Sequence, residues 1–185
     1  MRLGGGVLLL ILVAGVIAIV VARPDGDDDG GCAGAEPGWS VVDRVSDGDT
    51  IVVCGSTRVR LVQIDTPELS GERECFGEEA SAETKRLLAP GSSVRLVRDP
   101  RTDAVDDFGR LLRYVVREDG VNVNLRLVEL GAAAPYFYRG TRGIHAGELL
   151  ATARGARAAR KGLWGACPRT ELVPERNVST GPAQR

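Results

Sequence analysis

The sequence predicts an α+β fold in which a five-stranded β-barrel packs against three α-helices. Short segments rich in β-branched residues come mostly early in the chain, whereas three segments show apolar residues at helical spacing. Gly, Pro and Asp clusters mark turns between these segments. A length of 185 residues suits one folded domain with short tails. We therefore expect a small Greek-key barrel with helices packed against it.

The predicted strands share β-branched residues and partial alternation, and Ser46-Asp47-Gly48-Asp49 and Gly55-Ser56 form turn signals between the early ones. The strands cover residues 41–45, 50–54, 58–64, 94–98 and 111–116. Asp99-Pro100 opens a loop between the last two strands.

The predicted helices end at glycine or at a Pro-Gly pair. They cover about residues 78–89, 122–130 and 144–161, and the stop signals are Pro90-Gly91, Gly131 and Gly162. The predicted folded domain thus extends over residues 39–167, and the polar segment 168–185 is expected to be a disordered tail.

Residues 1–22 form an apolar N-terminal segment, uncharged from Leu3 to Ala22. It is long enough to span a bilayer as a transmembrane anchor, and it also fits a signal peptide cleaved after Ala22. The length slightly favours the uncleaved anchor, which would attach the protein to a membrane through residues 3–22. Arg2 favours a cytoplasmic N-terminus, so the domain is expected outside the cytoplasm, anchored or secreted. Residues 23–38 form an acidic, Gly-rich linker.

Four cysteines, Cys32, Cys54, Cys75 and Cys167, would then lie in an oxidising compartment. An even count predicts two disulfides, and three pairings are possible. We favour Cys75 with Cys167, which would tie the start of the first helix to the chain after the last one. A zinc site is not expected, because the chain has one His and no C-x-x-C pair.

The composition is that of an ordinary globular protein, with 43% hydrophobic and 26% charged residues and a net charge of −1. Residues 139–169 are basic, with Glu148 as their single acid. This segment can attract a polyanion or form a solvated helix face, and the sequence leaves both open. Nothing suggests a self-complementary surface, so we expect a monomer.

Two segments combine the residue types that phosphodiester chemistry needs. Asp47-Gly48-Asp49-Thr50 is followed by Arg60 and then by Asp65-Thr66-Pro67-Glu68. Carboxylate and carbonyl oxygens bind hard cations such as Ca²⁺, arginine matches phosphate, and a further carboxylate can accept a proton from water. Each segment alone is also typical of a turn or a strand end. Arg60 is harder to explain in that way, because an unpaired charge in an apolar strand is costly.

Two further segments add candidate substrate contacts. Phe108-Gly109-Arg110 places a second arginine after a turn glycine. Tyr136-Phe137-Tyr138 brings two tyrosines to one side if the backbone is extended, where they can stack on bases, although half-buried tyrosines are common at such positions.

The order of these segments resembles the staphylococcal nuclease (thermonuclease) family over residues 39–165. The matching motifs include those above and several others. These are Phe76-Gly77-Glu78-Glu79-Ala80-Ser81, Asp107-Phe108-Gly109-Arg110-Leu111-Leu112, Val123-Asn124, Leu127-Val128-Glu129-Leu130-Gly131 and Lys161-Gly162-Leu163-Trp164. The resemblance implies an OB-fold barrel with three helices, which agrees with the prediction from strand and helix patterns.

The resemblance also implies residue roles. Asp49 and Asp65 would hold Ca²⁺ through carboxylates, and Thr66 would do so through its carbonyl. Glu68 would be the general base. The remaining implied roles belong to Arg60 and Arg110, as clamps on the scissile phosphate, and to Tyr136 and Tyr138, as the lining of the nucleotide pocket. The implied substrates are DNA and RNA, and the implied products carry 3′-phosphates.

The chain departs from the family pattern at two places. Asp107 stands where family members often have a lysine that contacts a substrate phosphate, so we expect weaker nucleotide binding. The loop after Glu68 is shorter than in the best-known member and contains Cys75.

The leading hypothesis is an exported, Ca²⁺-dependent nuclease for single-stranded DNA and RNA, because a small pocket must reach a splayed backbone. One alternative is a catalytically weak nucleic-acid-binding module on the same fold. Another is a surface module that binds peptide or sugar, for which the spacing of acids and arginines would be a coincidence.

Overall fold

A computed structural model describes residues 32, 35–71 and 73–183 of the chain. The expected anchor or signal peptide, residues 1–22, and most of the expected linker lie outside these residues and stay predictions. Within the described ranges, no helix has the length and apolar character needed to cross a bilayer.

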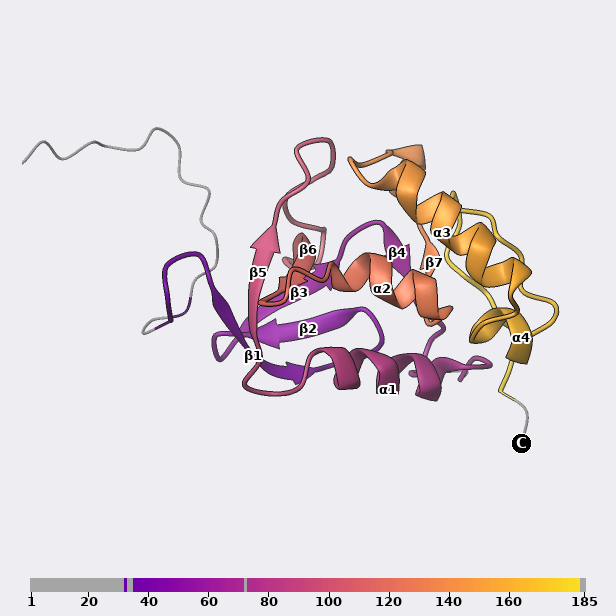
Figure 1. Cartoon of the computed structure of the whole chain (residues 1–185), viewed down its shortest axis with the longest axis horizontal. Helices are drawn as coiled ribbons and strands as arrows, with labels where there is room; N and C mark the ends of the chain where they lie inside the picture. Colours follow the sequence, from indigo (N-terminus) through magenta and orange to yellow (C-terminus); the bar gives the residue numbers. More distant parts are fainter. Residues whose placement is uncertain (1–31, 33–34, 72, 184–185) are drawn as a thin grey trace, which may run out of the picture.

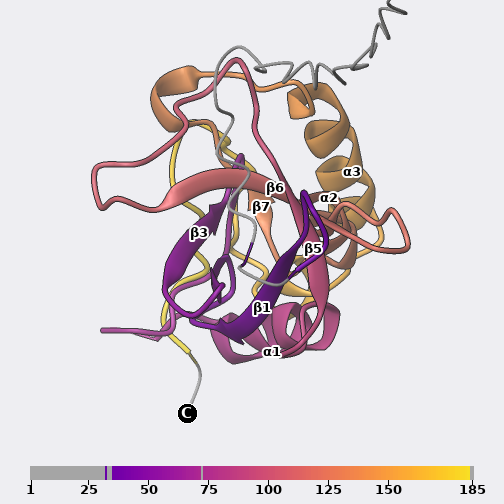
Figure 2. The ribbon, with the colours of Figure 1, turned by 90° about the vertical axis from the view of Figure 1, so that its left-hand side faces the viewer.

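Five strands close a barrel in which neighbours follow the order β1-β2-β3-β6-β5 (Figures 1 and 2). All neighbouring pairs are antiparallel except β3 with β6, which are parallel. The predicted five-stranded barrel with helices is confirmed. The barrel strands are β1 (Ser40–Val45), β2 (Thr50–Val53), β3 (Thr57–Leu61), β5 (Ser93–Val97) and β6 (Leu111–Arg117).

Helices cover the barrel on one side and extend away from it. Figure 1 shows α1 running along the lower edge of the barrel, α2 crossing beside β6, and α3 and α4 farther from β1. The three predicted helices are present, and two short helical segments accompany them. The helical elements are α1 (Gly77–Leu87), α2 (Val123–Leu130), a 3-10 turn (Tyr138–Gly140), α3 (Ala146–Ala158) and α4 (Leu163–Ala166).

The core fills the barrel and continues beneath α1, α2 and α3. Its members are aliphatic side chains that lose all contact with water, which is the main favourable term in folding. They include Ile51, Val53, Val59, Leu61, Val94, Val115, Leu127 and Leu149. The alternation expected for β3 follows from this packing, since Val59 and Leu61 face inward while Arg58 is exposed.

The predicted strand 58–64 is wrong in its last part, because the chain turns after Leu61. Gln63 adopts a left-handed backbone conformation (φ 64°), which few non-glycine residues adopt. Its side chain is held by a hydrogen bond to the Thr141 carbonyl (2.9 Å) and by one from the Gly143 N–H (2.6 Å). After this turn, β4 (Ile64–Asp65) leaves the barrel and pairs with β7 (Ala134–Pro135).

The predicted last helix also ends earlier than expected, at Ala158, because Arg160 is left-handed (φ 52°). The chain then returns against the end of α2. Gly131 closes α2 as predicted, and its carbonyl accepts a hydrogen bond from the Leu163 N–H (2.9 Å). A Cβ on Gly131 would lie 2.3 Å from the Lys161 carbonyl oxygen, so only glycine allows this approach.

The prediction of a disordered C-terminal tail is wrong for residues 168–183. Val178 and Thr180 are buried, and the Pro174 and Gly181 carbonyls accept hydrogen bonds from Phe137 and Cys75. Val178 packs in a small apolar cluster with Trp164. The polar composition of the segment concealed these few apolar and backbone contacts, which keep it on the domain.

Two disulfides join the described cysteines, Cys32 with Cys54 and Cys75 with Cys167. The second pair is the one that the sequence analysis favoured. It links the chain just before α1 to the chain just after α4. No free cysteine occurs among the described residues.

Asn124 is a buried polar residue that joins α2 to the barrel. Its side-chain oxygen accepts a hydrogen bond from the Val115 N–H (3.0 Å), and its amide donates to the Val62 (2.9 Å) and Arg113 (3.3 Å) carbonyls. Asn122, two residues earlier, caps α2 through the Leu125 N–H (3.3 Å).

We predict that Asn124→Ala lowers the free energy of unfolding by about 3 kcal/mol or more, because it removes three hydrogen bonds between a buried amide and the backbone. Asn122→Ala removes only the cap and should cost about 1 kcal/mol. Urea unfolding followed by circular dichroism measures both. Equal losses for the two variants would contradict the role given to Asn124.

Candidate active site

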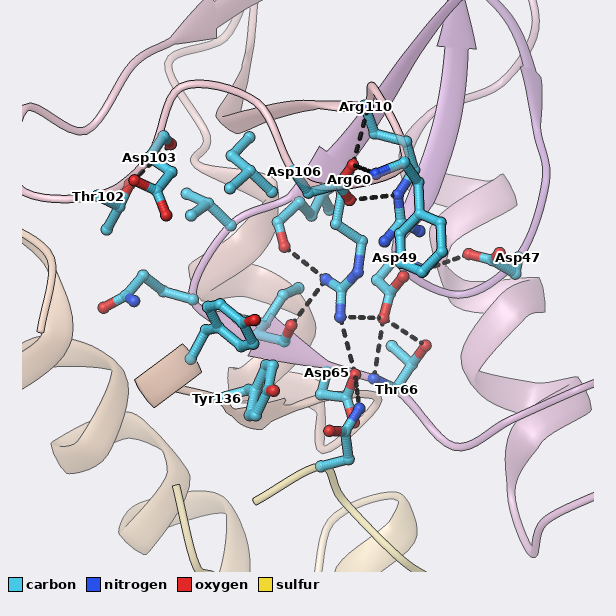
Figure 3. A pocket seen from close by; sticks show the side chains of 18 of the residues that line it. Asp47, Asp49, Arg60, Asp65, Thr66, Thr102, Asp103, Asp106, Arg110 and Tyr136 are labelled. Atoms are coloured by element: carbon cyan, nitrogen blue, oxygen red, sulfur yellow. Dashed lines mark hydrogen bonds and ion pairs between the residues drawn. The ribbon is translucent and has the colours of Figure 1, made fainter. Parts of the chain in front are cut away.

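A cavity of about 490 Å³ opens beside the barrel, where five segments meet. They are the β1–β2 turn, the segment from β3 to Leu69, the β5–β6 loop with the start of β6, the chain after β7, and the segment at Asn177 (Figure 3). All eight candidate metal, catalytic and substrate-binding residues from the sequence analysis line this cavity. They are Asp49, Arg60, Asp65, Thr66, Glu68, Arg110, Tyr136 and Tyr138.

Arg60 lies between two buried aspartates at the centre of the cavity. Its Nη2 contacts Asp49 Oδ2 at 3.0 Å and Asp65 Oδ1 at 2.8 Å, and the Arg60 side chain is only 12% exposed. Its Nη1 donates to the Leu61 (2.7 Å) and Ile64 (2.8 Å) carbonyls. Both terminal nitrogens of the guanidinium are therefore engaged, and the two carboxylates converge on one point.

Asp49 is placed by a turn that packs directly on Thr66. The Thr66 N–H and hydroxyl both contact Asp49 Oδ2 at 3.2 Å. Gly48 leaves room for this contact, because a Cβ there would lie 2.4 Å from Thr66 Oγ1. Thr84 of α1 donates to the Gly48 carbonyl at 2.6 Å, which holds the turn from the other side. The glycine in the Asp47-Gly48-Asp49 motif is thus required by packing.

Burial raises the pKa values of both aspartates. The loss of water around Asp65 raises its pKa to about 7, against the opposing effect of Arg60, and the charge of Asp49 adds to the increase. The pKa of Asp49 is raised for the same first reason, and Asp47 adds to it. The shifts show that one arginine compensates these carboxylates incompletely.

The donor set fits a hard divalent cation. When both aspartates are ionised, they and Arg60 together carry a net charge of −1, so an additional cation at the carboxylates would relieve their mutual repulsion. The available donors are oxygens, which hard cations prefer. No cluster of three or more His, Cys, Asp or Glu side chains suited to a metal occurs among the described residues, so two carboxylates would need further oxygens from the backbone and from water or substrate.

Glu68 lies at the rim of the cavity with its side chain exposed. Its pKa is raised by partial burial, and then by repulsion from Asp49, Asp47 and Glu74, with Arg60 opposing. Its backbone is fixed by a small loop, since the Glu68 N–H donates to Glu74 Oε2 and the Glu74 N–H donates to the Glu68 carbonyl, both at 3.0 Å. A Cβ on Gly77 would lie 2.7 Å from that carbonyl, so α1 packs closely on this loop.

Arg110 reaches the cavity from the start of β6. Asp106 holds it through Nε (2.7 Å) and through its backbone N–H (2.9 Å), and Nη1 lies 3.3 Å from Thr50 Oγ1. Partial burial would raise the pKa of Asp106, but hydrogen bonds from Arg110 outweigh this effect and lower it. Among the described residues, no hydrogen bond or ion pair engages Nη2 of Arg110, although the guanidinium carbon lies 5.5 Å from the centroid of the Phe108 ring, so Nη2 keeps a donor for a ligand.

Tyr136 and Tyr138 lie on the same side, as expected, with ring centroids 6.5 Å apart, while Phe137 between them is fully buried. Tyr138 is 46% exposed, and the Arg139 guanidinium carbon lies over its ring, 5.0 Å from the centroid.

Sequence reasoning found the end of the β5–β6 loop, at residues 107–110, but missed the contribution of residues 101–106 and of Asn177 to this cavity. Arg101, Thr102, Asp103 and Asp106 line it from the loop. The loop is fixed by Asp99, a fully buried carboxylate that accepts hydrogen bonds from the Tyr114 hydroxyl (2.8 Å) and the Ile144 N–H (2.8 Å). The length of the loop between β5 and β6 was the available signal, because long loops in compact domains are often functional.

We predict that the contribution of Asp65 to the stability of the metal-free protein declines as pH rises from about 4 to about 7. Asp65 has a raised pKa of about 7, so the folded state keeps a proton that the unfolded chain has already released. This contribution is complete below about pH 4 and declines by up to about 1.4 kcal/mol per pH unit.

The difference in unfolding free energy between wild type and Asp65→Asn, measured in chelator, isolates this group from the other carboxylates. It should fall as pH rises through this range. A difference that does not change with pH would contradict the assignment.

Comparison with known proteins places the chain in a family. The Staphylococcal nuclease homologue family matches residues 58–166. The chain is 41% identical over 109 residues to endonuclease YhcR of Bacillus subtilis, an alignment that covers 52% of this chain and 9% of that protein. It is 37% identical over 124 residues to an uncharacterized endonuclease of Escherichia coli O157:H7, covering 65% of this chain and 73% of the relative. The thermonuclease of Staphylococcus intermedius is 38% identical over 104 residues, with coverages of 53% and 60%. With this match and with the barrel and cavity described above, the chain belongs to the family of staphylococcal nuclease homologues.

Proposed function

We propose that this nuclease is a Ca²⁺-dependent hydrolase that cleaves phosphodiester bonds of DNA and RNA, preferably single-stranded, to products with 3′-phosphates. One observation carries the proposal. Asp49 and Asp65 converge on Arg60 in a cavity that Glu68 and Arg110 also line. This arrangement supplies a cation site, a base and phosphate ligands around one space.

Asp49, Asp65 and the Thr66 carbonyl would hold the Ca²⁺ ion. When bound, the ion polarises a phosphoryl oxygen and orients water. Calcium accepts six to eight oxygen ligands in variable geometry, so a site with few protein donors leaves positions for water and substrate. The nature of the donors supports a hard cation, and the choice of Ca²⁺ follows from the family resemblance.

Glu68 is the proposed general base. Its exposed carboxylate lies at the cavity rim, where it can take a proton from the attacking water. Attack on phosphorus forms a new P–O bond and breaks the bond to the 5′-oxygen, which takes a proton from solvent. The raised pKa of Glu68 brings it nearer to neutral pH and makes it a stronger base than an ordinary glutamate.

Arg110 is the freer of the two proposed phosphate ligands, because Asp106 orients it while Nη2 stays available. Fixed donors of this kind stabilise the negative charge that grows in the transition state. Arg60 acts on the same charge from within the carboxylate pair, where it limits the repulsion between Asp49 and Asp65.

Tyr136 and Tyr138 support the preference for single strands. Unstacked bases can pack on exposed aromatic faces, and such stacking depends little on sequence. The two tyrosines border the same cavity as the proposed phosphate ligands.

The two disulfides support the proposal that the domain functions outside the cytoplasm, since disulfides persist in oxidising compartments. Attachment through residues 3–22, or secretion after cleavage near Ala22, belongs to the same proposal.

One observation favours the weaker alternative, a binding module with little catalysis. Asp107 is exposed at the cavity rim, where its charge repels a substrate phosphate. The charged residues argue against a binding module without catalysis, because all five that are proposed for metal binding and catalysis line one cavity.

We predict that the purified full chain cleaves single-stranded DNA with Ca²⁺ and not with excess chelator. Glu68→Gln should reduce kcat by about 10²- to 10⁴-fold, because it removes the proposed base. Glu79 is an exposed residue of α1, and the variant Glu79→Gln is the matched control, which should keep wild-type activity. Absence of cleavage by folded, Ca²⁺-loaded wild type would overturn the nuclease proposal in favour of the binding module.

Replacement of Asp107 by lysine should lower KM several-fold, because it exchanges repulsion of the substrate for attraction. The gain should shrink as salt rises from 50 to 200 mM, as expected for a phosphate contact. Asp119→Lys makes the same charge change on the β6–α2 turn, away from the residues that line the cavity. If both variants lower KM equally, the effect is one of net charge, and a specific role for Asp107 is excluded.

A further inference from the structure

The C-terminal segment 170–183, here called the C-terminal strap, passes along the wall of the active-site cavity. It is attached on both sides of Asn177. The Phe137 N–H donates to the Pro174 carbonyl (2.6 Å) on one side. On the other, the Cys75 N–H donates to the Gly181 carbonyl (2.8 Å), and Thr180 Oγ1 donates to the Cys75 carbonyl (2.7 Å).

Between these attachments, the strap contacts Asp65 directly. The Val178 N–H donates to Asp65 Oδ2 at 2.8 Å, and Asn177 Nδ2 lies 3.4 Å from Asp65 Oδ1. Arg60 contacts the same Oδ1 at 2.8 Å. Both carboxylate oxygens therefore have a donor, and the plane of the carboxylate is set from two directions.

The donors on the strap are neutral, which distinguishes them from Arg60. A backbone N–H orients a carboxylate and offsets part of the cost of burying it, while the carboxylate keeps its full charge for a cation. Groups that hydrogen-bond to a metal-ligating side chain typically change metal affinity by 10- to 100-fold.

The strap also connects Asp65 to the loop that carries Glu68. Cys75 lies at the end of that loop and forms backbone hydrogen bonds with the strap. It is also disulfide-bonded to Cys167, which lies just before the strap in the sequence. The pairing of Glu74 with Pro182 and the hydrogen bond from the Ala183 N–H to the Arg73 carbonyl (2.8 Å) extend this contact. Two of the proposed functional carboxylates thus share one support.

We propose that the C-terminal strap is a positioning element of the metal site, which orients Asp65 for the cation through the Val178 N–H and, to a lesser extent, the Asn177 amide. This inference rests on the proposed function. It assigns to the last residues of the chain an effect on metal affinity that acts through Asp65 and not through contact with substrate.

The test compares Val178→Pro with Val178→Ala in the full chain with both disulfides formed. Proline removes the N–H, whereas alanine keeps it and loses only apolar packing against the cluster around Trp164. Isothermal titration with Ca²⁺ gives Kd, near-ultraviolet circular dichroism gives the folded fraction, and cleavage of single-stranded DNA gives kcat against Ca²⁺ concentration.

We expect Val178→Pro to bind Ca²⁺ about 10-fold more weakly than Val178→Ala, at the lower end of the range for such partners. Saturating Ca²⁺ should restore kcat toward the value of Val178→Ala. The near-ultraviolet signal of the two variants without Ca²⁺ should be equal, which a loss of folded protein would not allow. Asn177→Ala, at an exposed position, should raise Kd by about 3-fold, less than Val178→Pro because its contact is longer.

A Val178→Pro protein with the Ca²⁺ affinity of Val178→Ala would overturn the role of the strap while leaving the proposed function intact. If Val178→Pro does not fold, Asn177→Ala decides, and an unchanged Kd for it overturns the inference. Wild type that binds no Ca²⁺ would overturn the proposed function itself, and the role of the strap with it, so the two failures are distinguished by the wild-type titration.

Discussion

The contact of Arg60 with Asp49 and Asp65 is the interaction around which this structure is arranged. Three charges lie in a region that is largely shielded from water, and their sum is negative. A buried ion pair adds little net stability, but loss of one member is costly because the remaining charge is then unpaired. The carboxylates keep raised pKa values even with Arg60 present, so the fold maintains a site whose negative charge is only partly compensated. A divalent cation is the natural complement of such a site.

The rest of the molecule holds this cluster through neutral hydrogen bonds and close packing. Thr66 and Gly48 place Asp49, the left-handed turn at Gln63 directs β4 out of the barrel, and the strap fixes Asp65. None of these contacts brings a further charge to the carboxylates. The supporting structure can therefore define their orientation without competing for the position that a cation would take, and this separation of roles is consistent with a preorganised catalytic site.

Two covalent links extend the same arrangement outward. The Cys75–Cys167 disulfide joins the Glu68 loop to the root of the strap, and Cys32–Cys54 joins the chain before β1 to the end of β2. The β5–β6 loop, which lines the opposite part of the cavity, is held instead by the buried contact between Asp99 and Tyr114. The two loops that border the cavity, the Glu68 loop and the β5–β6 loop, are thus each tied to other elements, as expected when loops must hold reacting groups in place.

The sequence by itself determined the barrel, the three main helices and eight of the residues that line the cavity, because strand alternation, helix stop signals and the ordered motifs are local features of the chain. Gly131, for example, was identifiable as a helix end from its position alone. Tertiary structure decided what depends on contacts between distant segments. The break after Leu61 follows from the pairing of β4 with β7. The defined conformation of residues 168–183 follows from their hydrogen bonds with Asp65, Cys75 and Phe137. A polar segment of that kind resembles a disordered tail until the carboxylate that accepts its N–H groups is known.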